Sequence, residues 1–459
     1  MSTETLPNSN QTLLQKFSGV CTAIVQRYLP DPFLFAAILT FIVFLLVMPI
    51  TNQSPLQVVD AFAGGFWKLL KFAMQMALVV VTGQAMASAP VFRRGLSYLA
   101  MAAKTPGHAI LMVTVVSAIA CWINWGFGLV VGAIFARELA TRVKGVDYRL
   151  LIASAYTGFL FWHAGLSGSV PLALASGSNL ETVTAGALTS PIGTSETIFS
   201  SMNIIILLVM LAVIPLLNRA MHPTAENVFT IPSNLLFDEE ETEKFEPKTP
   251  AEKLEHSPWI NRILALLGFT YIVSYFIDNG FALNLNIVNF IFLFTAILLH
   301  GTPKRLLKAV AEGTKNTTGI LLQFPFYAGI MGMMVAKGPD GVSLAGAMSD
   351  MFVSISNETT FPLFTFLSAG IVNFFVPSGG GQWAVQAPIM MPAGLELGVP
   401  AAKTAMAIAW GDAWTNMIQP FWALPALSIA GLSAKDIMGY CIVSLLASGV
   451  IIGLGLMIL

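Results

Sequence analysis

The stretch that decides the fold is IVNFFVPSGGGQ, residues 371–382. It lies inside a longer run, 361–395, that contains no charged residue and is long enough to enter a lipid bilayer and return. Pro377 and three glycines interrupt the run, and irregular backbone at such a depth is tolerated only where protein buries it or where it lines a cavity. The stretch therefore predicts the tip of a re-entrant hairpin. The alternative is a kinked spanning helix with glycines at its packing contacts.

The composition indicates a polytopic membrane protein. Of the 459 residues, 56% are hydrophobic and only 10% are charged, and the mean hydropathy is +0.75. Soluble domains carry roughly 25% charged residues. The net charge of −1 gives no indication of a nucleic-acid surface. Cys21, Cys121 and Cys441 lie far apart without the spacing of a metal or redox site, which favours a packing role.

Basic residues and interruptions predict the course of the chain. The N-terminal segment 1–32 lacks the apolar core of a signal peptide, and its basic residues place it in the cytoplasm. The run 109–136 has basic residues on both flanks, so we expect both of its ends to be cytoplasmic and the run to be a hairpin with NWGFG, residues 124–128, at its tip. Glycine and proline within 150–180 and 404–430 predict transmembrane helices that are broken near mid-membrane.

These features predict two all-α transmembrane repeats, 33–217 and 284–459. Between them we expect a cytoplasmic linker, 218–258, and a connecting helix, 259–283. Apolar runs predict the remaining helices at 33–50, 66–89, 197–217, 259–277, 285–299, 317–336 and 437–459, with a short surface helix at 341–351. The segment 51–65 contains no Lys or Arg and is expected to be an external loop.

Similar residues recur at a nearly constant spacing in the two halves. The hairpin asparagines Asn124 and Asn373 are 373 − 124 = 249 residues apart, and His163 and Asp412 of the broken helices are 412 − 163 = 249 apart. The charge map places the first hairpin inside and the second outside. The sequence therefore predicts inverted-topology repeats, which are typical of secondary transporters whose substrate binds near the membrane midplane.

Candidate binding residues lie at the hairpin tips and in the broken helices. Broken helices expose N–H groups at one half-helix end and C=O groups at the other, which attract anions and cations respectively. The residues expected to contact substrate or ion are Asn124, Gly126, His163, Ser167, Ser169, Asn373, Ser378, Gly379, Gly380, Gln382, Asp412, Thr415 and Asn416. For each serine, threonine or asparagine, the alternative is a helix cap or an inter-helix hydrogen bond. Candidate pocket walls are Trp125, Trp162, Trp383 and Trp414, for which packing or interface anchoring is the alternative.

His163 and Asp412 are the ionisable residues of the two broken helices. An ionisable group at mid-membrane is costly, which favours a functional role, and we expect the two side chains to face each other near the midplane. The hairpins and the centres of the broken helices contain no Lys or Arg, so the charge of an anion must be met by N–H groups, hydroxyls and a co-bound cation. This favours a small monoanion carried with H⁺ or Na⁺, with Asn124, Asn373 and Asp412 as a candidate sodium site and no other cofactor.

Five motifs resemble those of the short-chain fatty acid transporter family of the ion transporter superfamily. They are YLPDPFLFAAILT (28–40), NWGFGLVVGAIFARE (124–138), GLSGSVPLALA (165–175), NFFVPSGGGQWAVQAP (373–388) and GDAWTNMIQPFWALP (411–425). The resemblance implies uptake of anions such as butyrate or acetoacetate across a bacterial inner membrane. The superfamily implies scaffold and transport domains, homodimers and elevator motion. The Ser-Asn-Thr tip motif of its sodium symporters is absent, which leaves the coupling ion open.

Other functional classes remain as alternatives. One is a passive channel, and another is a transporter for other carboxylates. A remote one is an intramembrane serine hydrolase, because residues 165–168 match a G-x-S-G pattern with His163 nearby. A serine nucleophile requires a base within hydrogen-bond reach, and His163 is only four residues before Ser167. We therefore expect a transporter and not an enzyme.

Overall fold

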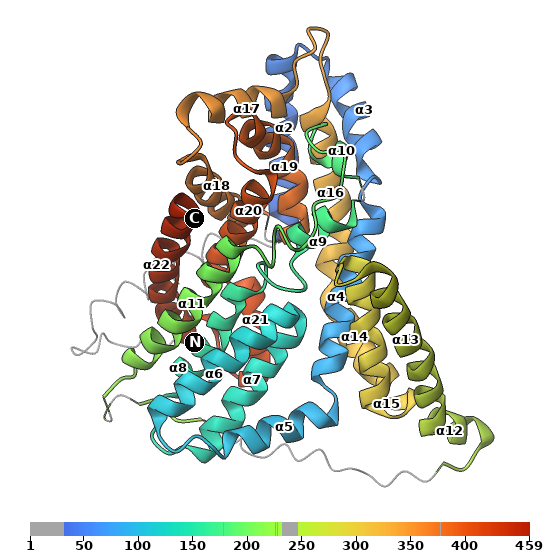
Figure 1. The fold of residues 1–459 in the computed structure, drawn as a ribbon, viewed down its shortest axis with the longest axis vertical. Helices are drawn as coiled ribbons and strands as arrows, with labels where there is room; N and C mark the ends of the chain where they lie inside the picture. The colour runs from blue at the N-terminus through green and yellow to red at the C-terminus, as the bar shows by residue number, and fades with distance from the viewer. Residues whose placement is uncertain (1–31, 178, 225, 227, 232–246, 377) are drawn as a thin grey trace, which may run out of the picture.

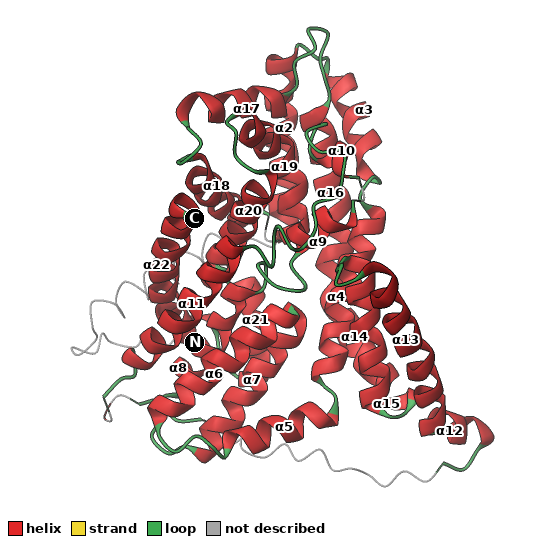
Figure 2. Cartoon of the chain, viewed as in Figure 1, coloured by secondary structure: helices red, strands yellow, loops and turns green. Residues whose placement is uncertain are grey.

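The computed structural model describes residues 32–459 apart from 178, 225, 227, 232–246 and 377 (Figure 1). Within that part of the chain the regular elements are α-helices and short 3₁₀ helices, with no strand (Figure 2). The expected all-α fold is confirmed. Cys21, nearly all of the N-terminal segment 1–32 and the acidic part of the linker 218–258 lie outside the described residues.

Most of the helices follow one another with short connections. The first half contains α2 (Pro32–Thr51), α3 (Pro55–Phe66), α4 (Leu70–Ala87), α5 (Pro90–Ala100), α6 (Pro106–Ile123), α7 (Trp125–Arg142), α8 (Tyr148–Thr157), η1 (Gly158–Phe161), α9 (Ser169–Ser176), α10 (Leu180–Val183) and α11 (Ser201–Ala220). The rest contains α12 (Pro250–Glu255), α13 (Pro258–Asn279), α14 (Leu285–His300), α15 (Pro303–Thr314), η4 (Lys315–Thr317), α16 (Thr318–Val335), α17 (Leu344–Ile355), α18 (Phe361–Phe375), α19 (Gly379–Glu396), α20 (Ala401–Thr415), η5 (Asn416–Ile418), α21 (Pro420–Ala430) and α22 (Ala434–Ile458).

Six helices of the described chain, α4, α6, α11, α13, α16 and α22, are long and apolar enough to cross a membrane. Their lipid-compatible surfaces are extensive. On α13, for example, Trp259, Leu266 and Ile277 are exposed. A soluble protein rarely exposes so many large apolar side chains, whereas the acyl chains of a bilayer accommodate them. The chain is therefore a multi-pass membrane protein.

The expectation that 51–65 is a loop is wrong, because most of this segment is helix α3. Ser54 and Gln57 form a capping box, in which each side chain accepts a hydrogen bond from the backbone N–H of the other residue, and Pro55 occupies the first helical position. Three residues then separate α3 from α4, so the helix expected over 66–89 begins only at Leu70. Helix α15 was likewise not predicted, because its Lys and Arg residues interrupt the apolar pattern by which the other helices are recognised.

The bounds of four helices agree with the proposed internal repeat. The starts and ends of α3 and α15 are 303 − 55 = 248 and 314 − 66 = 248 residues apart. Those of α4 and α16 are 318 − 70 = 248 and 335 − 87 = 248 residues apart. Equal spacing of both starts and ends supports a structural repeat of this region. The inverted orientation of the two halves stays a prediction.

Two helical pairs and two interrupted helices carry the residues expected to contact substrate or ion. Helices α6 and α7 meet at Asn124, and α18 and α19 flank residues 376–378. Figure 1 places the first pair toward one end of the long axis and the second pair toward the other. Residues 162–168 separate η1 from α9, and Gln419 separates η5 from α21. Helix ends therefore lie where glycine and proline interrupt the apolar runs, whereas the re-entrant course of the hairpins stays a prediction.

Candidate substrate and ion site

The interruption in the first half is held by the tip of the first hairpin. The Leu166 N–H donates to the carbonyl oxygen of Trp122 at 2.7 Å, and Ser167 Oγ accepts from the Trp125 N–H at 3.0 Å. A Cβ added to Gly165 would lie 2.1 Å from the Trp122 carbonyl oxygen, so this approach requires glycine. The backbone of the α6–α7 tip and the unwound residues 162–168 therefore form one hydrogen-bonded unit.

The second half has a similar arrangement. The Asn373 side-chain amide lies 2.9 Å from the Asp412 carbonyl oxygen, 3.0 Å from Thr415 Oγ1 and 2.9 Å from Asn416 Oδ1. The Gln419 amide donates to the carbonyl oxygen of Asn373. The second hairpin is therefore bound through Asn373 to the interruption in its own half, as Ser167 binds the first hairpin.

His163 and Asp412 join these two units. Their Nδ1 and Oδ2 atoms are 2.8 Å apart, and the two side chains are 0% and 1% exposed. The Val170 N–H donates to His163 Nε2 at 3.1 Å. Because Nε2 accepts, the ring proton is on Nδ1 and is donated to Asp412. The expectation that the two ionisable residues face each other is confirmed.

One carboxylate oxygen of this pair has no donor. Asp412 Oδ1 is buried and has no hydrogen-bond partner among the described residues. The same holds for three amide oxygens nearby in the second half, those of Asn373, Gln382 and Gln419. Buried acceptors are normally paired, so such oxygens are candidate ligands for a cation or, at the carboxylate, a position for a proton.

The second hairpin tip covers the ionisable pair. A Cβ at Gly379 would lie 2.7 Å from His163 Cε1 and 2.7 Å from Trp162 Cη2. The Trp162 ring in turn stacks on His163 with 4.1 Å between ring centroids. Trp125 packs on Trp162 at 5.9 Å, so these two tryptophans form an aromatic wall on the first-half side of the pair.

Asn124 has other partners in this conformation. Its Oδ1 accepts from the Phe127 N–H at 2.9 Å and caps α7, and its amide nitrogen lies 3.5 Å from the Val79 carbonyl oxygen. Within the described chain, these hydrogen bonds do not join Asn124 to Asn373 or Asp412, the other residues of the candidate sodium site. In this structure Asn124 therefore acts as a helix cap, which was the alternative to a binding role.

The remaining candidates lie around the two tips. Gly126 approaches the Val80 carbonyl oxygen, and Ser378 caps α19 by accepting from the Gly381 N–H at 3.4 Å. The Gln382 amide donates to the Ala369 carbonyl oxygen and to Gln386 Oε1, both at 2.8 Å. Ser169 is the buried first residue of α9.

Trp414 has a packing role, which was the alternative to a pocket wall. Its indole N–H donates to the Leu445 carbonyl oxygen of α22 at 2.7 Å, and its ring packs on Phe366 of α18 at 4.7 Å. The side chain therefore fixes α20 between two neighbouring helices.

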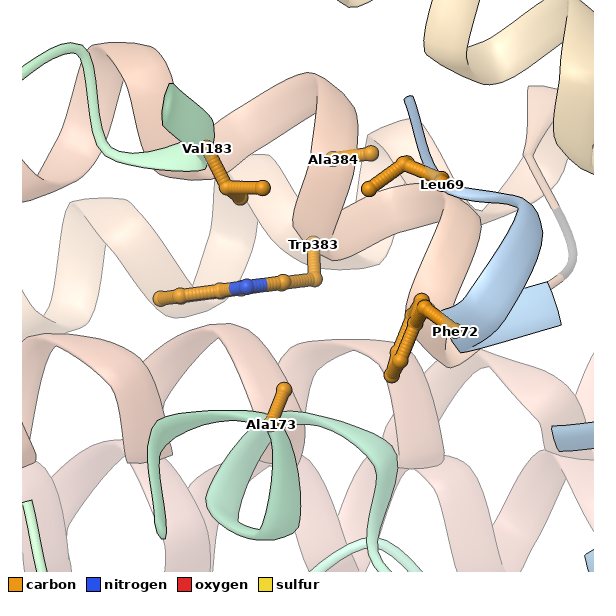
Figure 3. Close-up of a pocket in the computed structure, with 7 residues that line it drawn as sticks. Leu69, Phe72, Ala173, Val183, Trp383 and Ala384 are labelled. Atoms are coloured by element: carbon orange, nitrogen blue, oxygen red, sulfur yellow. The ribbon is translucent and has the colours of Figure 1, made fainter. Parts of the chain in front are cut away.

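An apolar pocket adjoins the second hairpin tip (Figure 3). Its lining residues come from the start of α4, from α9 and α10, and from α19: Leu69, Phe72, Ala173, Val183, Gly380, Trp383 and Ala384. In the close-up, the Trp383 ring extends between Val183 and Ala173. Of these residues, only Gly380 and Trp383 are evident from the sequence. The others are apolar residues in apolar surroundings and give no signal.

Two further residues position the interrupted helices. The Tyr156 hydroxyl on α8 donates to the Asn416 carbonyl oxygen of η5 at 2.7 Å. Asn203 on α11 donates to the Ala164 carbonyl oxygen at 3.1 Å and accepts from the Trp410 indole N–H at 3.0 Å. Asn203 therefore connects the interruption of one half to α20 of the other. In the sequence, Asn203 could have been recognised as an amide side chain within the apolar run 197–217.

Replacing Asn203 by Leu is expected to lower the free energy of unfolding by at least about 2 kcal/mol. The substitution leaves the Trp410 N–H and the Ala164 carbonyl without their partner, and each buried group left unpaired costs about 1–3 kcal/mol. Thermal unfolding in detergent measures the effect. Asn279→Leu is the matched control, because Asn279 is exposed and bonds only within its own helix. Equal melting temperatures for the two variants would contradict the prediction.

The geometry removes the basis for the serine hydrolase alternative. Both ring nitrogens of His163 are engaged, one by Asp412 and one by the Val170 N–H. Ser167 Oγ instead accepts from the Trp125 N–H. His163 is therefore not placed to act as the base that a Ser167 nucleophile would require.

The fold is similar to that of solved transporters. The YdaH transporter of Alcanivorax borkumensis matches with a TM-score of 0.58 and 16% identity over 94% of this chain and 97% of that one. MtrF of Neisseria gonorrhoeae, from a class of antimetabolite efflux pumps, matches with a TM-score of 0.54 and 15% identity over 96% of each chain. At these identities the likeness shows the fold alone.

Sequence comparison is more specific. A protein of Escherichia coli named "Putative short-chain fatty acid transporter" is 46% identical over 446 residues, which cover 97% of this chain and 99% of the relative. A protein of the same name in Haemophilus influenzae is 44% identical over 449 residues, with the same coverage. Residues 13–459 match the family described as short chain fatty acid transporter. The chain therefore belongs to the short-chain fatty acid transporter family.

Proposed function

We propose that this protein takes up short-chain fatty acid anions, of the butyrate and acetoacetate class, by symport with a cation. Family membership supports the substrate class. The observation that carries the coupling is the buried pair of His163 and Asp412, which joins the interrupted helices of both halves beneath the second hairpin tip. An ionisable group in such a position is costly and marks ion pathways in transporters.

The proton is the cation that the pair favours. In its ionised form Asp412 repels a carboxylate, whereas a proton on Asp412 removes that repulsion. His163 cannot take a second proton on Nε2 without losing its hydrogen bond from the Val170 N–H. Asp412 Oδ1 has no such partner among the described residues, so it is the atom that accepts the proton. Binding of the proton then permits binding of the anion, which is the coupling that symport requires.

Sodium is the second candidate, because of the unpaired oxygens in the second half. The side-chain oxygens of Asn373, Gln382 and Gln419 are buried without donors within the described part of the molecule. Amide and carboxylate oxygens are ligands for hard cations. Direct coordination of sodium by Asp412 Oδ1 would also account for the missing hydrogen-bond partner of this oxygen.

We further propose an elevator mechanism in a homodimer of a bacterial inner membrane. In this mechanism the two hairpins and the interrupted helices move as a transport domain against a scaffold. The hydrogen bonds of each hairpin tip to the interruption in its own half support movement as one body. The relatives from Escherichia coli and Haemophilus influenzae support a bacterial membrane.

Uptake of labelled butyrate into proteoliposomes tests the proposed function. With a more acidic exterior, we expect accumulation of butyrate above its external concentration, whereas an inward sodium gradient alone should have little effect. Protein-free liposomes correct for diffusion of the undissociated acid. Accumulation driven by sodium at constant pH would assign the coupling ion to the second candidate. Protein-dependent flux that only equilibrates butyrate under both gradients would instead indicate a passive channel.

Cysteine labelling tests the predicted hairpin. In a background without native cysteines, Thr105→Cys and Thr141→Cys are expected to react with an impermeant reagent from the cytoplasmic side only. Both residues are exposed, and Thr105 directly precedes α6 whereas Thr141 lies in the last turn of α7. Thr359→Cys, exposed just before α18, is the control expected to react from the outside. Labelling of positions 105 and 141 from opposite faces would contradict the hairpin and, with it, the inverted repeat.

A further inference from the structure

We propose that the groove between α12 and α15 binds the headgroup of an anionic phospholipid. The residues that line this groove are Glu255, Lys304, Arg305, Leu307 and Lys308. None of them belongs to the candidate substrate and ion site. The inference therefore goes beyond the proposed function and depends only on the membrane location of the chain.

The groove lies at the level where lipid headgroups are expected. Helix α12 is followed closely by α13, which is long and apolar enough to span a membrane, and α15 follows closely after the apolar helix α14. Figure 1 places α12 and α15 side by side at the lower end of the molecule, below α13 and α14. The groove has a volume of about 340 Å³. Sites for small molecules measure roughly 300–1,000 Å³, so the groove has room for a phosphate ester.

Positive charge dominates the lining of the groove. Lys304 Nζ lies 3.1 Å from Glu255 Oε2, so these two charges compensate each other. Arg305 and Lys308 are exposed and form no ion pair with any other residue that the structure describes. Two positive charges therefore remain for a ligand, and the phosphate of a phospholipid is complementary to them.

An apolar side chain in the same groove favours a lipid over a soluble anion. Leu307 is exposed beside the basic residues. On the neighbouring α13, Trp259 and Ile263 are exposed, and the Arg262 guanidinium lies 5.1 Å from the centroid of the Trp259 ring. Tryptophan and arginine at the end of a spanning helix are typical of the membrane interface. A lipid can place its phosphate on the cations and its acyl chains beside Leu307, whereas a free phosphate uses only the cations.

Helix α15 presents its basic residues from a fixed position. Its buried face includes Ala309 and Gly313, and a Cβ on Gly313 would lie 3.1 Å from the Val81 carbonyl oxygen of α4. Its opposite face carries Lys304, Arg305 and Lys308. Helix α15 therefore packs on a spanning helix and turns its basic face outward. Basic amphipathic helices at a membrane surface attract anionic lipids.

Substitutions in the groove should change lipid affinity in opposite directions. Each basic residue near an anionic membrane surface contributes a factor of about five to the affinity. The double variant Arg305→Gln and Lys308→Gln should therefore bind phosphatidylglycerol about 25-fold more weakly. Glu255→Gln should bind it about fivefold more tightly, because it releases Lys304 from its ion pair.

Control variants make the same changes of net charge outside the groove. Lys104→Gln combined with Lys144→Gln removes two exposed basic residues, and Asp278→Asn removes one exposed acidic residue near the other end of α13. None of these three residues lines the groove. All five substituted groove and control lysines, arginines and carboxylates that are exposed at the surface should leave the melting temperature in lipid-free detergent unchanged.

The experiment titrates the full-length protein in neutral detergent with phosphatidylglycerol or with phosphatidylcholine of the same acyl chains. Native mass spectrometry gives the dissociation constant of the first bound lipid. We expect tighter binding of phosphatidylglycerol, weaker binding by the double groove variant, tighter binding by the Glu255 variant, and changes of less than about twofold in the controls. Millimolar glycerol 3-phosphate, the soluble part of the headgroup, should not displace the lipid.

Three results would overturn the inference. One is equal affinity of the wild type for the two lipids. Another is a loss of affinity in the lysine control as large as that in the groove variant, which would show that net charge alone attracts the lipid. The third is displacement by glycerol 3-phosphate, which would make a soluble anion and not a lipid the occupant of the groove. Uptake of butyrate enters none of these measurements, so they do not depend on the proposed function.

Discussion

Replacing Asp412 with Asn is expected to abolish gradient-driven accumulation of substrate, with the internal concentration falling to the external one. The Asn side chain has nearly the same shape, and its amide oxygen can still accept from His163 Nδ1–H. It cannot carry the coupled proton or provide a charged ligand to sodium. Because the driving gradient acts only through the bound cation, loss of that cation leaves the substrate without a source of energy.

Exchange of substrate should persist in the Asp412→Asn variant although accumulation is lost. The hydrogen bonds that hold the hairpin tips do not involve the Asp412 carboxylate, so labelled butyrate inside should still exchange with unlabelled butyrate outside. Exchange by the variant should also be insensitive to external pH, whereas wild-type accumulation should increase as the exterior becomes more acidic. Both quantities can be measured on the same proteoliposomes, corrected with protein-free ones.

The geometry argues against a purely structural role for Asp412. A helix cap accepts hydrogen bonds from backbone N–H groups at the start of a helix. Asp412 lies instead within α20, three residues before its end, and its bonded oxygen accepts from the His163 side chain. Asp412→Ala is a useful comparison, because it leaves His163 Nδ1–H without an acceptor at a cost of about 1–3 kcal/mol in the free energy of unfolding. Full accumulation by the Asn variant would exclude Asp412 from coupling.

The arrangement of this pair was accessible from the sequence, because charge is rare in an apolar chain. His163 and Asp412 stand out from long runs without charge, and their equal positions in two similar halves predicted that they would meet. Asn373 and the three glycines were evident for the same reason. In a chain that is 56% hydrophobic, a polar or conformationally unusual residue carries most of the available information.

Other parts of the site could not be predicted, because their residues resemble their surroundings. Ala173, Val183 and Ala384 form a pocket only after α9, α10 and α19 come together. The hydrogen bonds from Leu166 to Trp122 and from Tyr156 to Asn416 involve backbone carbonyls, which every residue has. Helices α3 and α15 were missed because amphipathic helices of 12 residues are not the apolar runs by which spanning helices are recognised.

Replacing Gly380 with Val is expected to reduce transport at least about tenfold while leaving the protein folded and inserted. Gly380 is in the first turn of α19 and is not among the glycines with positive φ, so Val is compatible with its backbone. The expected effect is steric. A Cβ at this position would lie 2.5 Å from Phe72 Cε1, and the two methyl groups of Val extend further into the apolar pocket.

The loss should come from the hairpin tip. Val at this position crowds Phe72 and Phe324, and it hinders closure of the tip over His163 and Asp412 through the neighbouring Gly379. The aromatic rings of Phe72 and Phe324 can shift to relieve the contact, which is why the fold should tolerate the substitution at a cost of about 1–3 kcal/mol in the free energy of unfolding.

Gly64→Val provides the matched control. Gly64 is a helical glycine of α3, and a Cβ there meets no atom within 4 Å. Both variants are compared by thermal unfolding in detergent, by membrane insertion and by initial rates of labelled butyrate uptake. We expect wild-type uptake for the Gly64 variant and a folded but inactive Gly380 variant. Near-normal uptake with Val at position 380 would show that substrate does not approach the second hairpin tip and would place the binding site elsewhere.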